Sequence, residues 1–293
     1  MRMLITGSRG QLGSALARAF PDAMAFDRQK LDLSDAKALR ESIREHRPRV
    51  ILNAAAYTAV DQAETEAQTA FRINAQALEV IGAEARALDA LVVHWSTDYV
   101  FGASHNNADR PYREVDPTDP VNVYGASKLA GEQALEASGA AYLVFRCSWV
   151  YAEQGQNFIK TMLRVGAQRK QISVVADQWG VPTSADWLAA SLQQLFRQHE
   201  VDQLEAAKGV YHWVPAGTTH WAAYAEFVFA CAGMQVAVQP ISSEQWPTPA
   251  RRPGNSRLDC TKAISRWGLS QPDWKEEVAK CVHSLKADSH QAI

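Results

Sequence analysis

A tyrosine and a lysine lie four positions apart in the stretch NVYGASKLAGE, at Tyr124 and Lys128. In a helix this spacing places both side chains on one face. A free phenol has a pKa of about 10, which is too high for ready proton exchange at neutral pH. A neighbouring ammonium favours the phenolate, so the pair is suited to acid–base chemistry. Because such pairs also arise by chance on solvated helices, the surrounding elements must decide between the two interpretations.

Two hydroxyl groups, on Ser96 and Thr97, end a predicted strand at residues 91–97. In open α/β sheets, ligands bind at the carboxyl ends of the strands. A hydroxyl there can hydrogen-bond both a substrate carbonyl and the oxygen of Tyr124, where negative charge will grow. Side chains alternate along a strand, and we therefore assign this role to Thr97 rather than Ser96. Asp98 either binds substrate hydroxyls or caps a turn.

Three glycines in TGSRGQLG, at Gly7, Gly10 and Gly13, fall between the first predicted strand and the first predicted helix. Glycine permits a tight turn there and lets backbone N–H groups approach a pyrophosphate. The spacing is GxxGxxG rather than the commoner GxGxxG, so the alternative is a purely structural turn. The strand–turn–helix context favours a dinucleotide site.

The second predicted strand is followed by Asp27 and Arg28, which give opposite indications about the cofactor. An acid at this position typically binds ribose hydroxyls and indicates NADH, whereas a guanidinium can bind a 2′-phosphate and indicates NADPH. Both cofactors therefore remain open. Asp32 either hydrogen-bonds the adenine or caps the next helix. The small residues of AAAYT, at 54–58, leave room for a cofactor or serve tight packing of a helix on the sheet.

The fold follows from short apolar segments that alternate with amphipathic ones. We predict strands at 1–6, 23–26, 50–55, 91–97 and 140–151, and helices at 11–20, 35–47, 61–72, 74–88 and from Tyr124 onward. This order predicts the α/β class, with a Rossmann-type doubly wound parallel sheet. We assign residues 1–150 to an NAD(P)-binding domain. Residues 151–293 form a smaller, loop-rich, mainly substrate-binding region, from which some segments return to the first domain; 172–175 and 209–214 are candidate strands of either part.

Composition argues against several classes of protein. A net charge of −2 does not suit a nucleic-acid binder. The longest apolar runs, such as 140–145, fall far short of the roughly 20 residues of a membrane span. The start of the chain reads as a strand and not as a secretory signal. The widely spaced cysteines predict reduced thiols in a cytoplasmic protein; they are Cys147, Cys231, Cys260 and Cys281.

Motifs in both halves resemble the extended short-chain dehydrogenase/reductase family and, within it, the dTDP-4-dehydrorhamnose reductases. The matching stretches are NAAAYTAVDQAE, STDYVF, NVYGASKLAGE, RCSWVYAEQGQNF, QWGVPTSAD, GVYHWVPAGTTHWAAYA and PARRPGNSRLD. The resemblance implies NAD(P)H-dependent reduction of the 4-keto group of dTDP-4-dehydro-β-L-rhamnose, the last step of dTDP-rhamnose biosynthesis. It also implies that Tyr124 donates the proton, Lys128 lowers the pKa of the phenol, and Thr97 orients the carbonyl.

The motifs and the resemblance together assign the binding residues. For NADPH or NADH these are Gly7, Gly10, Gln11, Leu12, Gly13, Asp27, Arg28, Asp32, Leu33, Ala55, Ala56, Tyr57, Thr58, Tyr124 and Lys128. For the sugar nucleotide they are Thr97, Asp98, Tyr124, Lys128, Trp149, Asn157 and Arg252. Trp149 is equally well explained as a core residue, and Arg252 as part of a solvated basic loop. We interpret His94 as a core residue.

The resemblance also bears on metal ions and on partners. Some members of the family depend on magnesium, but the first helix here begins Ser14-Ala15 without an acid, so we predict no metal site. The sequence is compatible with a homodimer. One alternative function is a 4,6-dehydratase or 4-epimerase, although dehydratases typically carry Asp-Glu where this chain has Asp98-Tyr99. The other alternative is a non-catalytic dinucleotide-binding regulatory subunit, against which the intact Tyr124, Lys128 and Thr97 argue.

Overall fold

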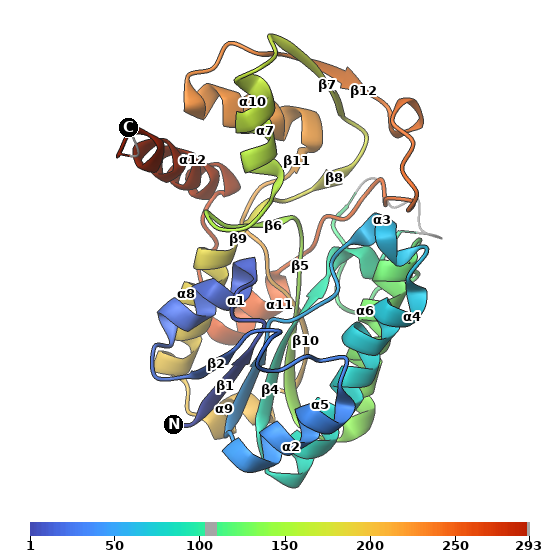
Figure 1. Cartoon of the computed structure of the whole chain (residues 1–293), viewed down its shortest axis with the longest axis vertical. Coiled ribbons are helices and arrows are strands. Elements are labelled where there is room, and N and C mark those ends of the chain that lie inside the picture. The colour runs from blue at the N-terminus through green and yellow to red at the C-terminus, as the bar shows by residue number, and fades with distance from the viewer. Residues whose placement is uncertain (103–109, 292–293) are drawn as a thin grey trace.

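A six-stranded parallel sheet forms the centre of the computed structural model, which describes residues 1–102 and 110–291. Its strand order is β10-β5-β4-β3-β1-β2, and every neighbouring pair is parallel. The predicted Rossmann-type α/β fold is thus confirmed (Figure 1). The strands are β1 (Met3–Thr6), β2 (Met24–Phe26), β3 (Val50–Asn53), β4 (Leu91–Thr97), β5 (Ala141–Cys147) and β10 (Gly209–His212).

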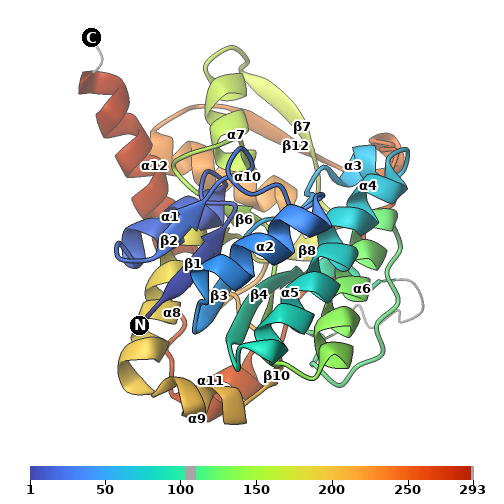
Figure 2. The same cartoon turned by 60° about the horizontal axis from the view of Figure 1, so that its bottom comes forward.

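Helices cover both faces of this sheet, because successive strand residues point to opposite sides. Ile5 belongs to a core that is completed by α1 (Gln11–Ala19), α8 (Ala185–Gln198) and α11 (Thr261–Trp267). Its neighbour Leu4 belongs to a second core under α2 (Ala36–His46), α5 (Ala77–Ala87) and α6 (Val123–Ser138). Figure 2 shows the two helical layers on either side of the strands.

The chain beyond residue 151 divides between the sheet and a smaller unit that lies above it in Figure 1. Strand β10 joins the sheet, and α8, α9 (Val201–Ala206) and α11 pack near it. The smaller unit contains α7 (Phe158–Gly166), α10 (Trp221–Ala232) and three pairs of short strands. These pairs are β7 (Gln171–Val175) with β12 (Ala237–Ile241), β8 (Trp179–Gly180) with β11 (Thr219–His220), and β6 (Val150–Tyr151) with β9 (Thr183–Ser184). The last helix, α12 (Trp274–Gln291), packs against α10.

The predicted helices at 61–72 and 74–88 are divided differently in the structure. The interruption falls after α3 (Val60–Ala63), and α4 (Ala67–Phe71) then continues through a π-helical turn, Arg72–Gln76, into α5. Such turns are rare and frequently mark functional sites. Here the turn carries Asn74, whose buried side chain hydrogen-bonds the backbone of Tyr57 and the hydroxyl of Ser127. The hydrogen bonds that Asn74 makes to distant residues therefore accompany a helix geometry that the spacing of apolar residues did not predict.

The predicted strand at 140–151 ends earlier, at Cys147. Trp149 has a φ of +46°, a left-handed conformation that a bulky residue seldom adopts and that breaks the strand. The following pair, Val150–Tyr151, leaves the main sheet and joins β9. The residues after this break enter the smaller unit, so the turn at Trp149 redirects the chain across the ends of the sheet.

Candidate functional site

A cleft with a volume of about 760 Å³ opens at the carboxyl ends of β1, β3 and β4. This is where the chain order reverses, because β2 pairs with one side of β1 and β3 with the other. Ligands bind at such switch points in open α/β sheets. The cleft is lined by the glycine turn, residues 54–60, residues 95–99, Tyr124, Lys128 and two tryptophans.

The glycine turn can accept a dinucleotide because side chains are excluded from it. Gly7 has a φ of +69°, which L-residues rarely adopt. A Cβ on Gly13 would lie 2.0 Å from the carbonyl oxygen of Gly7, so α1 packs directly on the turn. Gly10 precedes α1 and provides no side-chain cap, which leaves the N–H groups of the helix start available to an anion. The residues present therefore fit the dinucleotide that the sequence predicted.

Of the charged residues that follow β2, Arg28 and Asp32 lie at the cleft, whereas Asp27 lies outside its lining. Arg28 and Asp32 line the cleft, and their side chains form an ion pair at 3.3 Å. Asp27 does not line it. Its carboxylate accepts hydrogen bonds from the backbone N–H groups of Gln29 and Lys30 and pairs with Arg9 at 2.9 Å. The proposed contact of Asp27 with a ribose would therefore have to compete with partners that it already has.

Asp32 closes a turn rather than capping the following helix. Its carboxylate accepts a hydrogen bond from the N–H of Ser34, and the N-cap of α2 is Asp35. Burial alone would raise the pKa of Asp32, but the hydrogen bonds from Ser34 and Arg28 outweigh it and the pKa is lowered. The helix-capping alternative is thus wrong, and the carboxylate stays ionised beside the cleft.

The small residues after β3 form one wall of the cleft. Ala55, Ala56, Tyr57 and Thr58 all line it, as predicted. Asn74 holds this wall in place: its side-chain oxygen accepts from the N–H of Tyr57 at 2.8 Å and its nitrogen donates to the carbonyl of Tyr57 at 3.0 Å. Leu12, Leu33, Gly10 and Gln11 also line the cleft.

Helix α6 brings Tyr124 to the end of β4. Its N-cap, Asn122, accepts a hydrogen bond from the N–H of Gly125 at 2.8 Å. A Cβ on Gly125 would lie 2.1 Å from the carbonyl oxygen of Tyr99, so the glycine lets the helix approach the turn after Thr97 closely. Tyr124, Thr97 and Asp98 consequently line the same part of the cleft.

The phenol of Tyr124 does not have the lowered pKa that the sequence led us to expect. Burial raises its pKa, and a hydrogen bond with Thr97 opposes this effect only in part. Lys128, one helical turn away, directs its ammonium to His94 and to the carbonyl oxygen of Trp95 instead. Tyr124 is partly exposed at the cleft, yet its hydroxyl lies deep enough for burial to dominate. The phenol is therefore protonated at neutral pH, which is the state that a proton donor requires.

Thr97 and Asp98 act as a linked pair beside this phenol. The hydroxyl of Thr97 donates to the carboxylate of Asp98 at 3.0 Å and accepts from the N–H of Tyr99 at 3.1 Å. Burial raises the pKa of Asp98 to about 7, although hydrogen bonds with Ser256 and Thr97 act in the opposite direction. A carboxyl that titrates near neutrality can donate or accept a hydrogen bond at a sugar hydroxyl.

A stacked pair of tryptophans also lines the cleft, and the sequence indicated only one of the two. Trp149 lines the cleft as predicted, and Trp221, at the start of α10, stacks on it with ring centroids 3.7 Å apart. Trp221 lies in the matched stretch TTHWAAYA, but nothing in its spacing distinguishes a cleft residue from a core residue. A ring pair of this kind offers an apolar surface to the hydrophobic face of a ligand.

Asn157 and Arg252 have structural partners and do not line the cleft. Asn157 caps α7 and donates to the side-chain oxygen of Gln11 and the carbonyl of Ala152. It therefore joins the smaller unit to the glycine turn through Gln11. Arg252 forms two hydrogen bonds of 2.8 Å with Asp61 on α3, and these hydrogen bonds, more than its charge, lower the pKa of that carboxyl. Direct substrate contact by either residue would require a change of partner.

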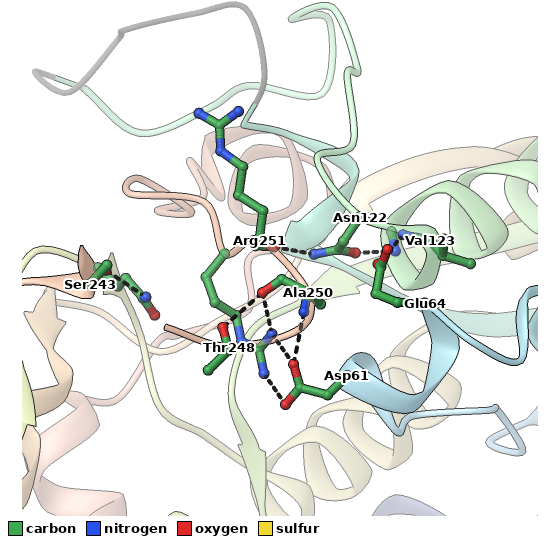
Figure 3. Close-up of polar contacts among 11 residues, drawn as sticks. Asp61, Glu64, Asn122, Val123, Ser243, Thr248, Ala250 and Arg251 are labelled. Atoms are coloured by element: carbon green, nitrogen blue, oxygen red, sulfur yellow. Dashed lines mark hydrogen bonds and ion pairs between the residues drawn. The ribbon is translucent and has the colours of Figure 1, made fainter. Parts of the chain in front are cut away.

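Figure 3 shows how the loop around Arg252 is fastened to the Rossmann side of the cleft. Asp61 accepts from the N–H of Ala250, and Asn122 donates to the carbonyl oxygen of Arg251 (Figure 3). The side chain of Arg251 extends away from Asp61. The loop thus contacts both α3 and the N-cap of the helix that carries Tyr124.

Other expectations concern metals, membranes and thiols. Among the residues that the structure describes, no cluster of His, Cys, Asp and Glu side chains is arranged to hold a metal ion. Within the same residues, no helix combines the length and apolar character needed to cross a bilayer. The four cysteines are free thiols.

Comparison with known proteins gives consistent matches over the whole chain. The family model described as "RmlD substrate binding domain" matches residues 1–287. A dTDP-4-dehydrorhamnose reductase of Sinorhizobium fredii is 39% identical and covers 100% of both chains. That of Escherichia coli K12 is 42% identical over 97% of this chain and 98% of its own. A crystal structure of the Bacillus anthracis dTDP-4-dehydrorhamnose reductase with NADP superposes with a TM-score of 0.87, at 35% identity over 97% of this chain and 99% of that one.

Proposed function

Because this chain belongs to the RmlD substrate-binding family, we propose that it is an NADPH- or NADH-dependent reductase acting on dTDP-4-dehydro-β-L-rhamnose. The product would be dTDP-β-L-rhamnose. The observation that carries the proposal is the convergence of Tyr124, Thr97 and Lys128 on one cleft that begins at the glycine turn. Full-length identity of 39–42% to proteins named for this reaction supports the choice of substrate.

The cofactor would lie along the cleft from the glycine turn to Lys128. The turn between Gly7 and Gln11 would hold the pyrophosphate through backbone N–H groups, and Arg28 and Asp32 would face the adenosine end. When bound, the reduced nicotinamide supplies the hydride that the keto carbon accepts. The wall at residues 55–58, held by Asn74, would pack beside the cofactor.

The residues at the chemical end would supply the proton and the geometry. Tyr124 holds a proton at neutral pH and would donate it to the C4 oxygen as that oxygen becomes basic. Thr97 would hydrogen-bond the same oxygen and the phenol, and Asp98 would fix a neighbouring sugar hydroxyl. Lys128 would contribute a positive charge that becomes more favourable to Tyr124 as the phenolate forms.

The apolar ring pair of Trp149 and Trp221 suits the other side of the hexose. A 6-deoxy sugar carries a methyl group where most hexoses carry a hydroxymethyl group, and a stacked indole wall favours such a methyl. Asp98 is followed by Tyr99 rather than by a second acid, and we therefore favour reduction over elimination of water.

The test is an assay with purified protein, dTDP-4-dehydrorhamnose, and NADPH or NADH in parallel. We expect loss of absorbance at the dihydronicotinamide band and appearance of dTDP-rhamnose by NMR spectroscopy. dTDP-glucose, which has no keto group, serves as the matched control and should give no oxidation. Binding of NADPH without turnover of the keto sugar would instead identify a regulatory subunit.

A further inference from the structure

Lys128 is a buried cation whose two hydrogen-bond partners carry no negative charge. Its Nζ lies 3.0 Å from His94 Nε2 and donates to the carbonyl oxygen of Trp95 at 2.7 Å. The side chain is 1% exposed. Burial lowers its pKa to about 8, while the neighbouring Cys147 and Glu132 act in the opposite direction. Glu132 is itself paired with Arg146 at 2.6 Å, so the local environment of the ammonium depends on neutral acceptors.

His94 also belongs to a row of three buried polar side chains, which lie on three neighbouring strands of the sheet. Thr6 on β1, Asn53 on β3 and His94 on β4 are direct partners in the sheet register. Asn53 Nδ2 lies 3.0 Å from His94 Nδ1, and Thr6 Oγ1 donates to Asn53 Oδ1 at 2.5 Å. All three residues are 1% exposed. Central strands of a parallel sheet are normally apolar, and burying polar groups costs free energy unless each is hydrogen-bonded.

The row joins the two ends of the cleft. Thr6 immediately precedes Gly7, and its hydroxyl accepts a hydrogen bond from the N–H of Ala55, at the start of the alanine wall. At the other end His94 contacts Lys128. The row therefore connects the glycine turn, the wall and the lysine beneath the floor of the cleft.

Hydrogen-bond chemistry links the tautomer of His94 to the charge of Lys128. Burial, reinforced by the charge of Lys128, lowers the pKa of His94 well below its ordinary value, so the imidazole is neutral. An ammonium can only donate, so Nε2 must then accept and Nδ1 must carry the hydrogen. That hydrogen requires the amide oxygen of Asn53, whose oxygen and nitrogen are interchangeable in shape.

The opposite tautomer suits an uncharged Lys128. With the amide nitrogen of Asn53 facing Nδ1, as it does in the structure, Nε2 carries the hydrogen and can donate to an amine. A half-turn of the Asn53 amide thus adapts the row to either charge state. Leucine or valine at position 94 could not form a hydrogen bond with either charge state of Lys128.

We propose that His94 is a positioning residue that acts through Lys128, and that its tautomer follows the orientation of the Asn53 amide, which Thr6 contacts. It holds Nζ at the chemical end of the cleft and, with Nε2 as the acceptor, stabilises the ammonium form on which cofactor binding depends. The proposal rests on the proposed function to the extent that Lys128 contacts the cofactor.

The test is the affinity for NADPH between pH 6 and 9, measured by fluorescence, for His94→Leu and for the matched control His94→Gln, which keeps an acceptor. We expect His94→Leu to bind NADPH about tenfold more weakly at pH 8, as for loss of a hydrogen bond to a charged group. The pH at which affinity falls should move about one unit lower, whereas His94→Gln should stay near the wild type. An unchanged pH dependence in His94→Leu would overturn the proposal.

A double-mutant cycle separates action through Lys128 from a packing effect. In a Lys128→Met background, His94→Leu should cause no further loss of NADPH affinity. Additive losses would show that His94 acts by another route. These binding measurements do not involve the sugar nucleotide, so they remain decisive even if the wild type fails to reduce dTDP-4-dehydrorhamnose.

If His94→Leu fails to fold, ¹⁵N NMR of histidine in the wild-type protein provides the answer. The signal of His94 is identified as the one that shifts most in Lys128→Met. We expect a neutral ring down to pH 5, with Nε2 unprotonated below pH 7 and protonated as Lys128 loses its charge. A ring with Nε2 protonated throughout pH 6–9 would contradict the proposal.

Discussion

The two ends of the cleft hold their charged groups in opposite environments. At the nucleotide end, the side chains of Arg9 and Arg28 are 75% and 80% exposed and pair with nearby carboxylates. At the chemical end, Lys128 is 1% and Asp98 2% exposed, and burial is the largest influence on the pKa of each. Exposed ion pairs contribute about 0–1 kcal/mol, whereas buried charges are costly unless they are well partnered.

This contrast indicates that the two ends work by different means. At the nucleotide end, we expect binding to depend mainly on the backbone N–H groups of the glycine turn, because the charged side chains there are exposed and screened by solvent. At the other end, burial brings the pKa values of Asp98 and Lys128 close to neutrality and keeps the phenol of Tyr124 protonated. Substitutions should therefore have large effects where groups are buried or backbones touch, and small effects where charges are exposed.

The largest effect is expected at Tyr124. Tyr124→Phe removes the acid but keeps the ring, so NADPH affinity should change little. Turnover should fall by the roughly 10²–10⁴-fold typical of losing a general acid. Steady-state kinetics and fluorescence titration check the two parts separately. A rate within a few-fold of the wild type would exclude tyrosine as the proton donor.

A backbone contact should give the next largest effect. In Gly13→Ala the new Cβ would lie 2.0 Å from the oxygen of Gly7, which forces the turn to move. We expect NADPH affinity to fall about tenfold or more, with a loss of stability of about 1–3 kcal/mol from overpacking. Gly233→Ala is the control, because nothing lies within 4 Å of the added Cβ, although its φ of +67° adds a backbone strain that Gly13 does not have. Unchanged NADPH affinity in Gly13→Ala would show that the turn tolerates rearrangement.

The variant Asp98→Asn tests whether burial of an ionised carboxylate at the chemical end lowers the stability of the folded protein. Its pKa is raised from 3.8 to about 7, so the folded state binds more protons than the unfolded state between these values. Its contribution to stability therefore falls as pH rises from about 4 to 7 and stays low above that. Asp98→Asn should melt at a higher temperature than the wild type at pH 8, by roughly 2–4 °C per kcal/mol gained, but not at pH 4. A difference independent of pH would mean that ionisation of Asp98 is not the cause.

The sequence predicted the elements whose function depends on local pattern. Apolar strands, the glycine spacing and the four-residue separation of Tyr124 and Lys128 are all visible in one dimension. The resulting sheet and cleft have the predicted arrangement, with Thr97, Asp98 and Trp149 on its lining.

What the sequence did not predict depends on long-range contacts. Trp221 meets Trp149 across 72 positions of chain, and Asn157 meets Gln11 across 146. Neither contact produces a regular spacing of residues that could be recognised in the sequence. The direction of the Tyr124 pKa was missed for a similar reason: spacing shows which residues share a helical face, but burial depends on everything packed around that face. His94 was correctly interpreted as a core residue, but a lone histidine in a strand shows nothing of the Asn53 and Lys128 side chains beside it.

The smallest effect is expected at Arg28, and its direction would distinguish the two cofactors. Arg28→Ala removes an exposed guanidinium that lines the cleft 3.3 Å from Asp32. If Arg28 binds a 2′-phosphate, KM for NADPH should rise by about fivefold, as for an exposed ion pair, while KM for NADH stays constant. Arg18→Ala is the control, because it removes an equal charge from the outer part of α1, where Arg18 pairs with Asp186. Equal changes for both cofactors would assign Arg28 to positioning Asp32, and a change above a hundredfold would contradict the view that exposed charges at this end act weakly.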